Sequence, residues 1–142
     1  MEQDEPLLLR LQKDQLYAGQ DAQGNGLRPT YQEDPYFKTR DAAQRYSDWK
    51  DRLHQREHNP LFLKRPSGTP NLIITGSWFY DTLIADVNGG ALHVRSDSWL
   101  FGKLEAKYGQ ALLGLSSVAL RYYVEEMLFP RLKPNVYKWL NQ

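Results

Sequence analysis

Apolar side chains recur at helical spacing along four stretches of this chain. The stretches run over residues 4–19, 41–58, 97–108 and 116–129. The candidate caps are Asp4, Asp41, Asp97 or Ser98, and Ser116 or Ser117, whose side chains can accept a hydrogen bond from the first turn of a helix. Gly19 and Gly109 close the first and third stretches, because glycine readily adopts the left-handed conformation that ends a helix. The pattern therefore predicts four helices, with Pro130 kinking or ending the last one.

The same spacing indicates which side of two helices packs inward. In the second helix, the apolar positions that share a face are Ala42, Tyr46, Trp49 and Leu53. In the last helix, they are Val118, Tyr122 and Leu128. We expect these side chains to pack against the core, with the charged positions between them in water.

Two short runs, 84–87 and 91–96, flank an Asn-Gly-Gly sequence. Asn-Gly and Gly-Gly readily take the positive φ angles of tight hairpin turns. Leu92 and Val94 alternate with polar residues, so one face of the second run should be buried and the other in water. The two runs therefore predict an antiparallel hairpin.

Prolines divide the region before the hairpin. Three of them predict an extended arm over residues 59–70. The apolar run 72–74 predicts a short buried strand, and Ser77 can cap a brief helix. The chain is therefore predicted to be α+β, with helices packed on a small antiparallel sheet that has a central hairpin and an extended arm. Its 142 residues suit a single domain over 1–142.

Composition narrows the classes of function. The 18 Lys and Arg residues nearly balance the 17 Asp and Glu residues, which argues against a dedicated binder of phosphate backbones. The absence of cysteine excludes disulfides, thiolate catalysis and cysteine-ligated zinc. No apolar run approaches the ~20 residues that span a bilayer, so we expect no membrane partner.

His54, Glu57 and His58 form an H-x-x-E-H pattern, which is found in one class of zinc peptidases. Two histidines four residues apart share a helix face, and the glutamate could act as a base. The motif stands beside Asn59-Pro60 and lacks a defined third ligand. Histidines near a helix C-terminus also suit the helix dipole without any metal. A metal-dependent hydrolase is therefore an alternative interpretation, and a structural role for these residues is favoured.

Basic residues lie among aromatic ones near the C-terminus, a composition typical of proteins that bind single-stranded nucleic acid. They are Arg121, Tyr122, Tyr123, Arg131, Lys133, Tyr137, Lys138 and Trp139. Glu125 and Glu126 interrupt the patch, so direct DNA contact is not favoured. A nucleic-acid-binding accessory protein is the second alternative.

Three short motifs follow one another along the chain. The first, over residues 16–24, has a G-x-D-x-x-G pattern and precedes a proline-containing loop. The second, over 70–79, has an L-x-x-T-G pattern and opens the brief helix. The third, over 107–116, ends in a Gly-Leu-Ser turn ahead of the last helix. In order and spacing they resemble the virion-morphogenesis family of tailed bacteriophages, the small neck or tail-completion proteins that join head and tail.

The resemblance implies a structural virion protein with no enzymatic activity, no cofactor and no small-molecule substrate. Such proteins are made in the cytoplasm of the bacterial host. They assemble as a ring of identical copies, typically a hexamer, between the head connector and the tail proteins. In such a ring, each contact joins two different surfaces. The side chains expected at these contacts are Leu61, Phe62, Trp78, Phe79, Arg95, Tyr123 and Trp139.

Overall fold

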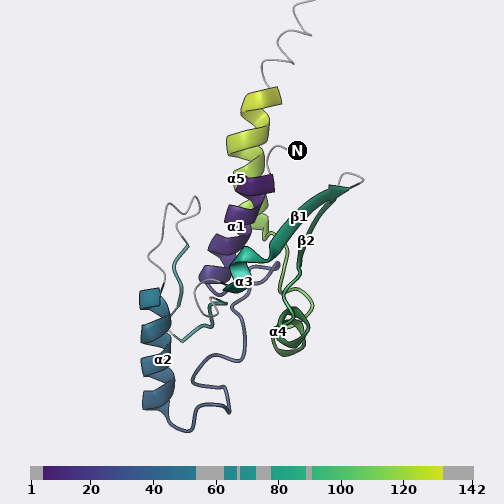
Figure 1. The fold of residues 1–142 in the computed structure, drawn as a ribbon. Coiled ribbons are helices and arrows are strands. Elements are labelled where there is room, and N and C mark those ends of the chain that lie inside the picture. Colours follow the sequence, from purple (N-terminus) through teal and green to yellow (C-terminus); the bar gives the residue numbers. More distant parts are fainter. Residues whose placement is uncertain (1–4, 54–62, 67, 73–77, 89–90, 133–142) are drawn as a thin grey trace, which may run out of the picture.

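A computed structural model describes residues 5–53, 63–66, 68–72, 78–88 and 91–132 (Figure 1). Its helices and strands, in chain order, are α1 (Glu5–Tyr17), α2 (Arg40–Leu53), α3 (Trp78–Asp81), β1 (Leu83–Asn88), β2 (Ala91–Ser96), α4 (Phe101–Tyr108), α5 (Ser117–Tyr123) and the π-helical turn η2 (Val124–Leu128). Helices packed with one two-stranded antiparallel sheet make up this part of the chain, which confirms the predicted α+β class.

The first helix and the last one pack side by side, and the hairpin projects beside them (Figure 1). Leu8 and Leu11 of α1 are buried against Leu115, Ala119 and Tyr123. Burying a leucine side chain stabilises a fold by roughly 1.5–3 kcal/mol. This apolar cluster therefore fixes α1 against α5.

A second apolar cluster lies at the other end of α1. It contains the buried side chains of Leu16, Leu27, Leu72, Phe79, Leu83 and Leu112. These residues come from α1, three loops, α3 and β1. The cluster therefore joins α1 to the middle of the chain and to the loop before α5.

The antiparallel pairing of β1 with β2 confirms the predicted hairpin, whose turn residues 89–90 lie outside the described residues. Ala85 pairs with Val94, and Asp86 pairs with His93. Ala85 is buried and Val94 is partly buried, whereas Asp86 and His93 are exposed. The alternation of buried and exposed residues is confirmed for these pairs.

Helix ends follow local capping chemistry. The hydroxyl of Ser116 accepts a hydrogen bond from the N–H of Ala119, so Ser116 caps α5 as expected. Gly109, with φ of 105°, ends α4 as expected, but the N-cap of α4 is Leu100, which makes no side-chain cap bond, so the predicted cap at Asp97 or Ser98 is wrong. At α2 the cap is Thr39, whose hydroxyl accepts from the N–H of Ala42 at 3.1 Å, and the predicted cap at Asp41 is wrong.

The predicted inner face of α2 is right at Tyr46, which is partly buried against Tyr31 and Phe37, and wrong at Trp49, which is 43% exposed. The side chain of Leu53 lies outside the described residues, and among those described Ala43, Ser47 and Lys50 are buried. The neighbours of α2 explain the difference, because the Ser47 hydroxyl accepts a hydrogen bond from the backbone N–H of Gly68. The helix packs partly against a polar loop, so apolar spacing does not locate its buried side.

The last helix differs from prediction in two respects. Val118 is exposed, because the helix turns Ala119 and Tyr123 inward instead. The α-helix gives way to the π-turn η2, in which the N–H of Phe129 donates to the carbonyl of Val124, and helix continues to residue 132. Pro130 therefore does not end the helix.

The predicted arm is only partly extended away from the fold. Thr69, Pro70 and Leu72 are buried, and Leu72 is in no strand. Residues 63–66 form neither helix nor strand, whereas 59–62 and 73–74 lie outside the described residues. The C-terminal end of the arm is therefore part of the core.

The buried side-chain amide of Gln15 connects three segments. Its nitrogen donates to the carbonyls of Asp21 at 2.8 Å and Gly114 at 2.7 Å. Its oxygen accepts from the N–H of Ser116 at 2.8 Å. One turn earlier, the oxygen of Gln12 accepts from the N–H of Gly114 at 2.7 Å, while the Gln12 side-chain nitrogen is buried without a partner. Backbone groups buried in these loops are thus paired by side chains of α1.

We expect Gln15→Leu to lower the free energy of unfolding by about 3 kcal/mol, because the Ser116 N–H and the Gly114 carbonyl lose this bond inside the protein. Gln12→Leu should cost only about 1 kcal/mol, since it also removes an unpaired buried nitrogen. Urea denaturation followed by circular dichroism measures both. Equal losses would contradict the role assigned to Gln15.

We expect Gly19→Ala to destabilise the fold by about 3 kcal/mol, because Gly19 has φ of 75° and a Cβ there would meet Thr69 and lie 2.8 Å from the Pro70 carbonyl oxygen. Gly102→Ala is the matched control. It lies in α4 with open space around it, so it should be neutral or stabilising by up to about 1 kcal/mol. Thermal melts would contradict this expectation if the two variants lost the same stability.

Candidate functional site

The structure places three of the expected contact residues where their environment can be described. Phe79 is fully buried and Tyr123 is 3% exposed, both inside the apolar clusters. Neither can reach a neighbouring copy in this fold, so we withdraw both from the contact set. Arg95 is exposed on β2 and forms ion pairs with Asp86 at 3.2 Å and Asp97 at 2.7 Å.

The remaining expected positions lie outside what the structure describes. They are Leu61, Phe62, Trp139 and the side chain of Trp78, together with His54, Glu57 and His58 of the H-x-x-E-H pattern. The C-terminal basic and aromatic residues are described only up to 132, and there the burial of Tyr123 removes one ring from any stacking surface.

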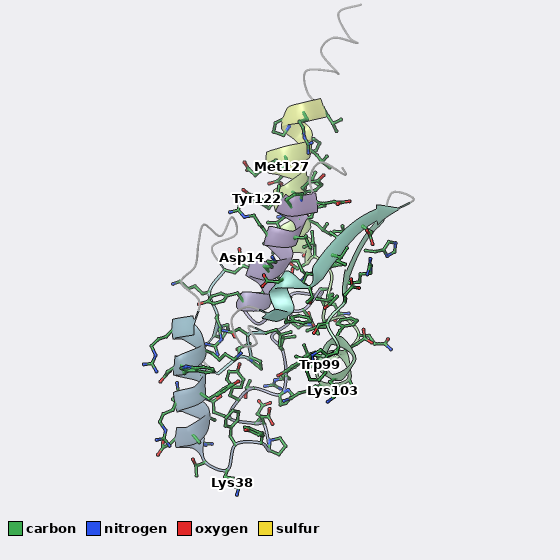
Figure 2. The ribbon with its side chains drawn as sticks, viewed as in Figure 1. Asp14, Lys38, Trp99, Lys103, Tyr122 and Met127 are labelled. Carbon is green, nitrogen blue, oxygen red and sulfur yellow. The ribbon has the colours of Figure 1, made fainter. Side chains whose placement is uncertain are left out.

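The described residues enclose a cavity of about 310 Å³ between α2, α4 and the loops that precede them. Side chains fill the region between these two helices (Figure 2). Five of the eleven lining residues are aromatic, namely Tyr31, Tyr36, Phe37, Tyr46 and Tyr108. No sequence motif predicts this site, because its residues come from separate segments.

The rings support one another by edge-to-face contact. Tyr31 meets Phe37 with centroids 5.9 Å apart and Tyr46 with centroids 5.0 Å apart, and their planes are nearly perpendicular. Phe37 also lies 5.1 Å from Tyr46. Such aromatic pairs favour this geometry because ring edges are positive and ring faces negative. The wall is therefore held together by the rings themselves.

Lys50 is the buried charge of this cavity. Its side chain lines the cavity, the residue is only 4% exposed, and its Nζ lies 5.8 Å from the centre of the Tyr46 ring. Within the described part of the chain, no residue forms a hydrogen bond or ion pair with it. Burial, with a smaller contribution from Arg65, lowers the pKa of Lys50 to about 8.

Arg65 holds the loop beside Lys50. Its guanidinium donates to the carbonyl of Thr69 at 2.6 Å and to the Ser47 hydroxyl at 2.9 Å, and it stacks 5.7 Å from the centre of the Tyr31 ring. These contacts hold the Arg65 guanidinium against Thr69, Ser47 and the ring of Tyr31. They also fasten α2 to the segment that carries Thr69.

The other two charges of the cavity form a pair. Lys107 donates to Asp34 at 2.6 Å, and the N–H of Tyr36 donates to the same carboxylate at 3.0 Å. Burial alone would raise the pKa of Asp34, but these hydrogen bonds outweigh it and lower the pKa. Burial likewise opposes the charge of Lys107, and the bond to Asp34 raises its pKa overall. Both groups are therefore charged at neutral pH, and they neutralise each other.

Two separate apolar surfaces lie outside the cavity. The C-terminal apolar surface consists of Phe129, 58% exposed, and Leu132, 51% exposed, which lie three residues apart on the helix. The α2 aromatic surface is the side chain of Trp49, which is 43% exposed. α5 and α2 stand at opposite ends of the molecule (Figure 1).

Comparison with protein families, with curated protein sequences and with solved structures gives no match for this chain. Among the described residues, no helix has the length and apolarity needed to cross a bilayer. The same residues contain no group of three His, Cys, Asp or Glu side chains placed to hold a metal ion.

The burial of Lys50 has a consequence for stability. Its pKa in the folded state is about 8, below the ordinary 10.5, so between these values the unfolded chain binds the extra proton. Raising the pH from about 7 to about 10 should therefore stabilise the native protein, by up to about 3 kcal/mol. Above this window the effect reverses, because burial raises the pKa of Tyr31, Tyr46 and Tyr108 and their ionisation favours the unfolded state.

We expect Lys50→Met to be more stable than the wild type at pH 7, with the difference shrinking as the pH rises toward 10. Urea denaturation at a series of pH values measures this difference directly. The exposed Lys103 is the control, since Lys103→Met should leave the wild-type slope intact. Parallel curves for wild type and Lys50→Met would contradict the burial of the charge.

Proposed function

We propose that this chain is a structural virion protein of a tailed phage, which assembles with copies of itself into a ring at the head–tail junction. The motif resemblance supports the phage assignment. The C-terminal apolar surface, whose large side chains stand in water in the single chain, supports assembly and is the observation on which the proposal rests.

The described parts of the three motifs that carry the resemblance contact one another. Gly19 lies against Thr69 and Pro70, where the second motif segment begins, and residues 73–77 of that segment lie outside the described residues. The N–H of Ala22 donates to the carbonyl of Ala111 in the third segment at 2.8 Å. Within the first motif, the Asp21 carboxylate accepts from two backbone N–H groups of its own loop. Segments that contact one another in this way support the interpretation of the motifs as one structural unit.

The positions of the two apolar surfaces favour a head-to-tail contact. A closed ring needs two different, complementary surfaces on every copy. Phe129 and Leu132 are three residues apart and therefore neighbours on the helix. Trp49 on α2 supplies an aromatic side chain of the kind that anchors interfaces. The partner proposed for the C-terminal apolar surface is thus the α2 aromatic surface of a second copy.

We expect the purified wild-type chain to form oligomers, and Phe129→Glu and Trp49→Glu each to remain monomeric, because either substitution places a charge in the contact. An equimolar mixture of the two variants should form heterodimers, since one intact surface remains on each. Light scattering after size-exclusion chromatography, with negative-stain imaging, measures the assemblies. Trp99→Glu, at an exposed position outside both surfaces, is the control and should assemble normally.

A wild type that stays monomeric at roughly 100 µM would contradict self-assembly. Oligomers that survive both glutamate substitutions would contradict these surfaces. Circular dichroism checks the fold of each variant, which should persist because Phe129 and Trp49 are both exposed.

A further inference from the structure

We propose that the cavity between α2 and α4 binds a small aromatic carboxylate, with Lys50 as the partner of the carboxylate group. The inference is independent of the assembly role, since it rests on the cavity walls and on a buried cation without a described counter-ion. Its volume of about 310 Å³ lies in the range of small-molecule sites.

The walls favour a flat, unsaturated ligand. Tyr31, Tyr46 and Tyr108 present rings to the cavity, and Leu72 and Leu104 complete an apolar lining. Aromatic rings gain stabilisation from edge-to-face or offset contact beyond the burial of their area. The cavity walls therefore favour a ligand that contains an aromatic ring.

The charged side chains that line the cavity favour a ligand whose aromatic ring carries a single negatively charged group. Of the charged side chains that line the cavity, Lys107 and Asp34 neutralise each other through their 2.6 Å hydrogen bond. Lys50 is left, so the cavity carries a net charge of +1 when its amine is protonated. The guanidinium of Arg65 is committed to Thr69 and Ser47. A single positive charge matches a carboxylate better than a doubly charged phosphate.

The burial of Lys50 strengthens the proposed interaction between its ammonium group and the carboxylate of the ligand. Lys50 is only 4% exposed, and a charge pair inside a protein is screened far less than in water. An arriving carboxylate would restore the charge balance that the described residues do not provide. The same contact would raise the pKa of Lys50 toward its ordinary value, so binding near pH 8 should take up protons.

The test uses 2-naphthoate as the probe, titrated into the full chain by isothermal calorimetry at pH 7. Three comparison compounds separate the features of the ligand: 2-naphthamide lacks the charge, cyclohexanecarboxylate lacks the aromatic face, and 2-naphthyl phosphate carries a second charge. We expect saturable binding of 2-naphthoate in the micromolar to low millimolar range, with each comparison compound about tenfold weaker.

The variants assign the binding to the cavity. Lys50→Met should weaken 2-naphthoate binding at least about tenfold, and Tyr36→Leu about threefold, because Tyr36 lies at the open edge of the cavity. Tyr36 is largely exposed, so its removal should leave the fold intact. Lys103→Met is the matched control: Lys103 is exposed, lies over the ring of Trp99, 5.4 Å from its centre (Figure 2), and does not line the cavity. It should bind as the wild type does.

Four results would overturn the proposal. They are the absence of saturable binding, equal affinity for the amide, tighter binding of the phosphate, and full affinity in Lys50→Met. The same titration of Phe129→Glu separates this site from assembly, since the variant is expected to lose oligomers and keep the ligand. Loss of binding there would contradict the independence of the cavity.

Discussion

The side-chain amide of Gln15 is the constraint on which the rest of the structure depends. A loop that turns beneath a helix buries backbone groups, and each must find a partner or destabilise the fold. Gln15 supplies three such bonds, to Asp21, Gly114 and Ser116. Because these residues begin the first loop and the last helix, one amide fixes how the two ends of the chain meet. The apolar contacts of Leu11 with Ala119 then follow from that position.

The α2 side of the molecule is held by different chemistry. Among the described side chains of α2, the buried ones are Ala43, Ser47 and Lys50. Hydrogen bonds of Ser47 and Arg65 connect the helix to the loop at Gly68. The rings of Tyr31 and Tyr46 provide the apolar part of this attachment. The cavity is a result of this arrangement, since rings that meet edge to face leave space that a regular layer of leucines would fill.

Local signals account for what the sequence could predict. The hairpin follows from Asn-Gly-Gly between two short runs, and the ends of α4 and α5 follow from Gly109 and Ser116, because each signal acts within a few residues. The buried face of α2 could not be found in this way, since a serine and a lysine occupy it. Its partners lie 18 to 21 residues away on a polar loop, where apolar periodicity gives no signal.

The cavity was beyond sequence reasoning for the same reason, although one signal was present. Tyr31, Tyr36, Phe37 and Tyr46 concentrate aromatic rings in a short segment that ends next to Lys50. A stretch so rich in rings buries some of them, and a lysine at its end is then either exposed or enclosed by them. Only the contact of α2 with the loop at Gly68 decides that Lys50 is enclosed.

An enclosed lysine without a described counter-ion is costly for a protein that only needs to pack. A methionine has a similar length and would fill the same space without any loss of hydration, so a charge here lowers stability. The cost falls when an anion enters the cavity, because the ammonium then regains the electrostatic partner that it lost on leaving water. Lys50 therefore lowers the stability of the fold while the cavity is empty and favours binding of an anion there. This cost of burying the Lys50 charge favours the interpretation of the cavity as a binding site over that of a packing defect.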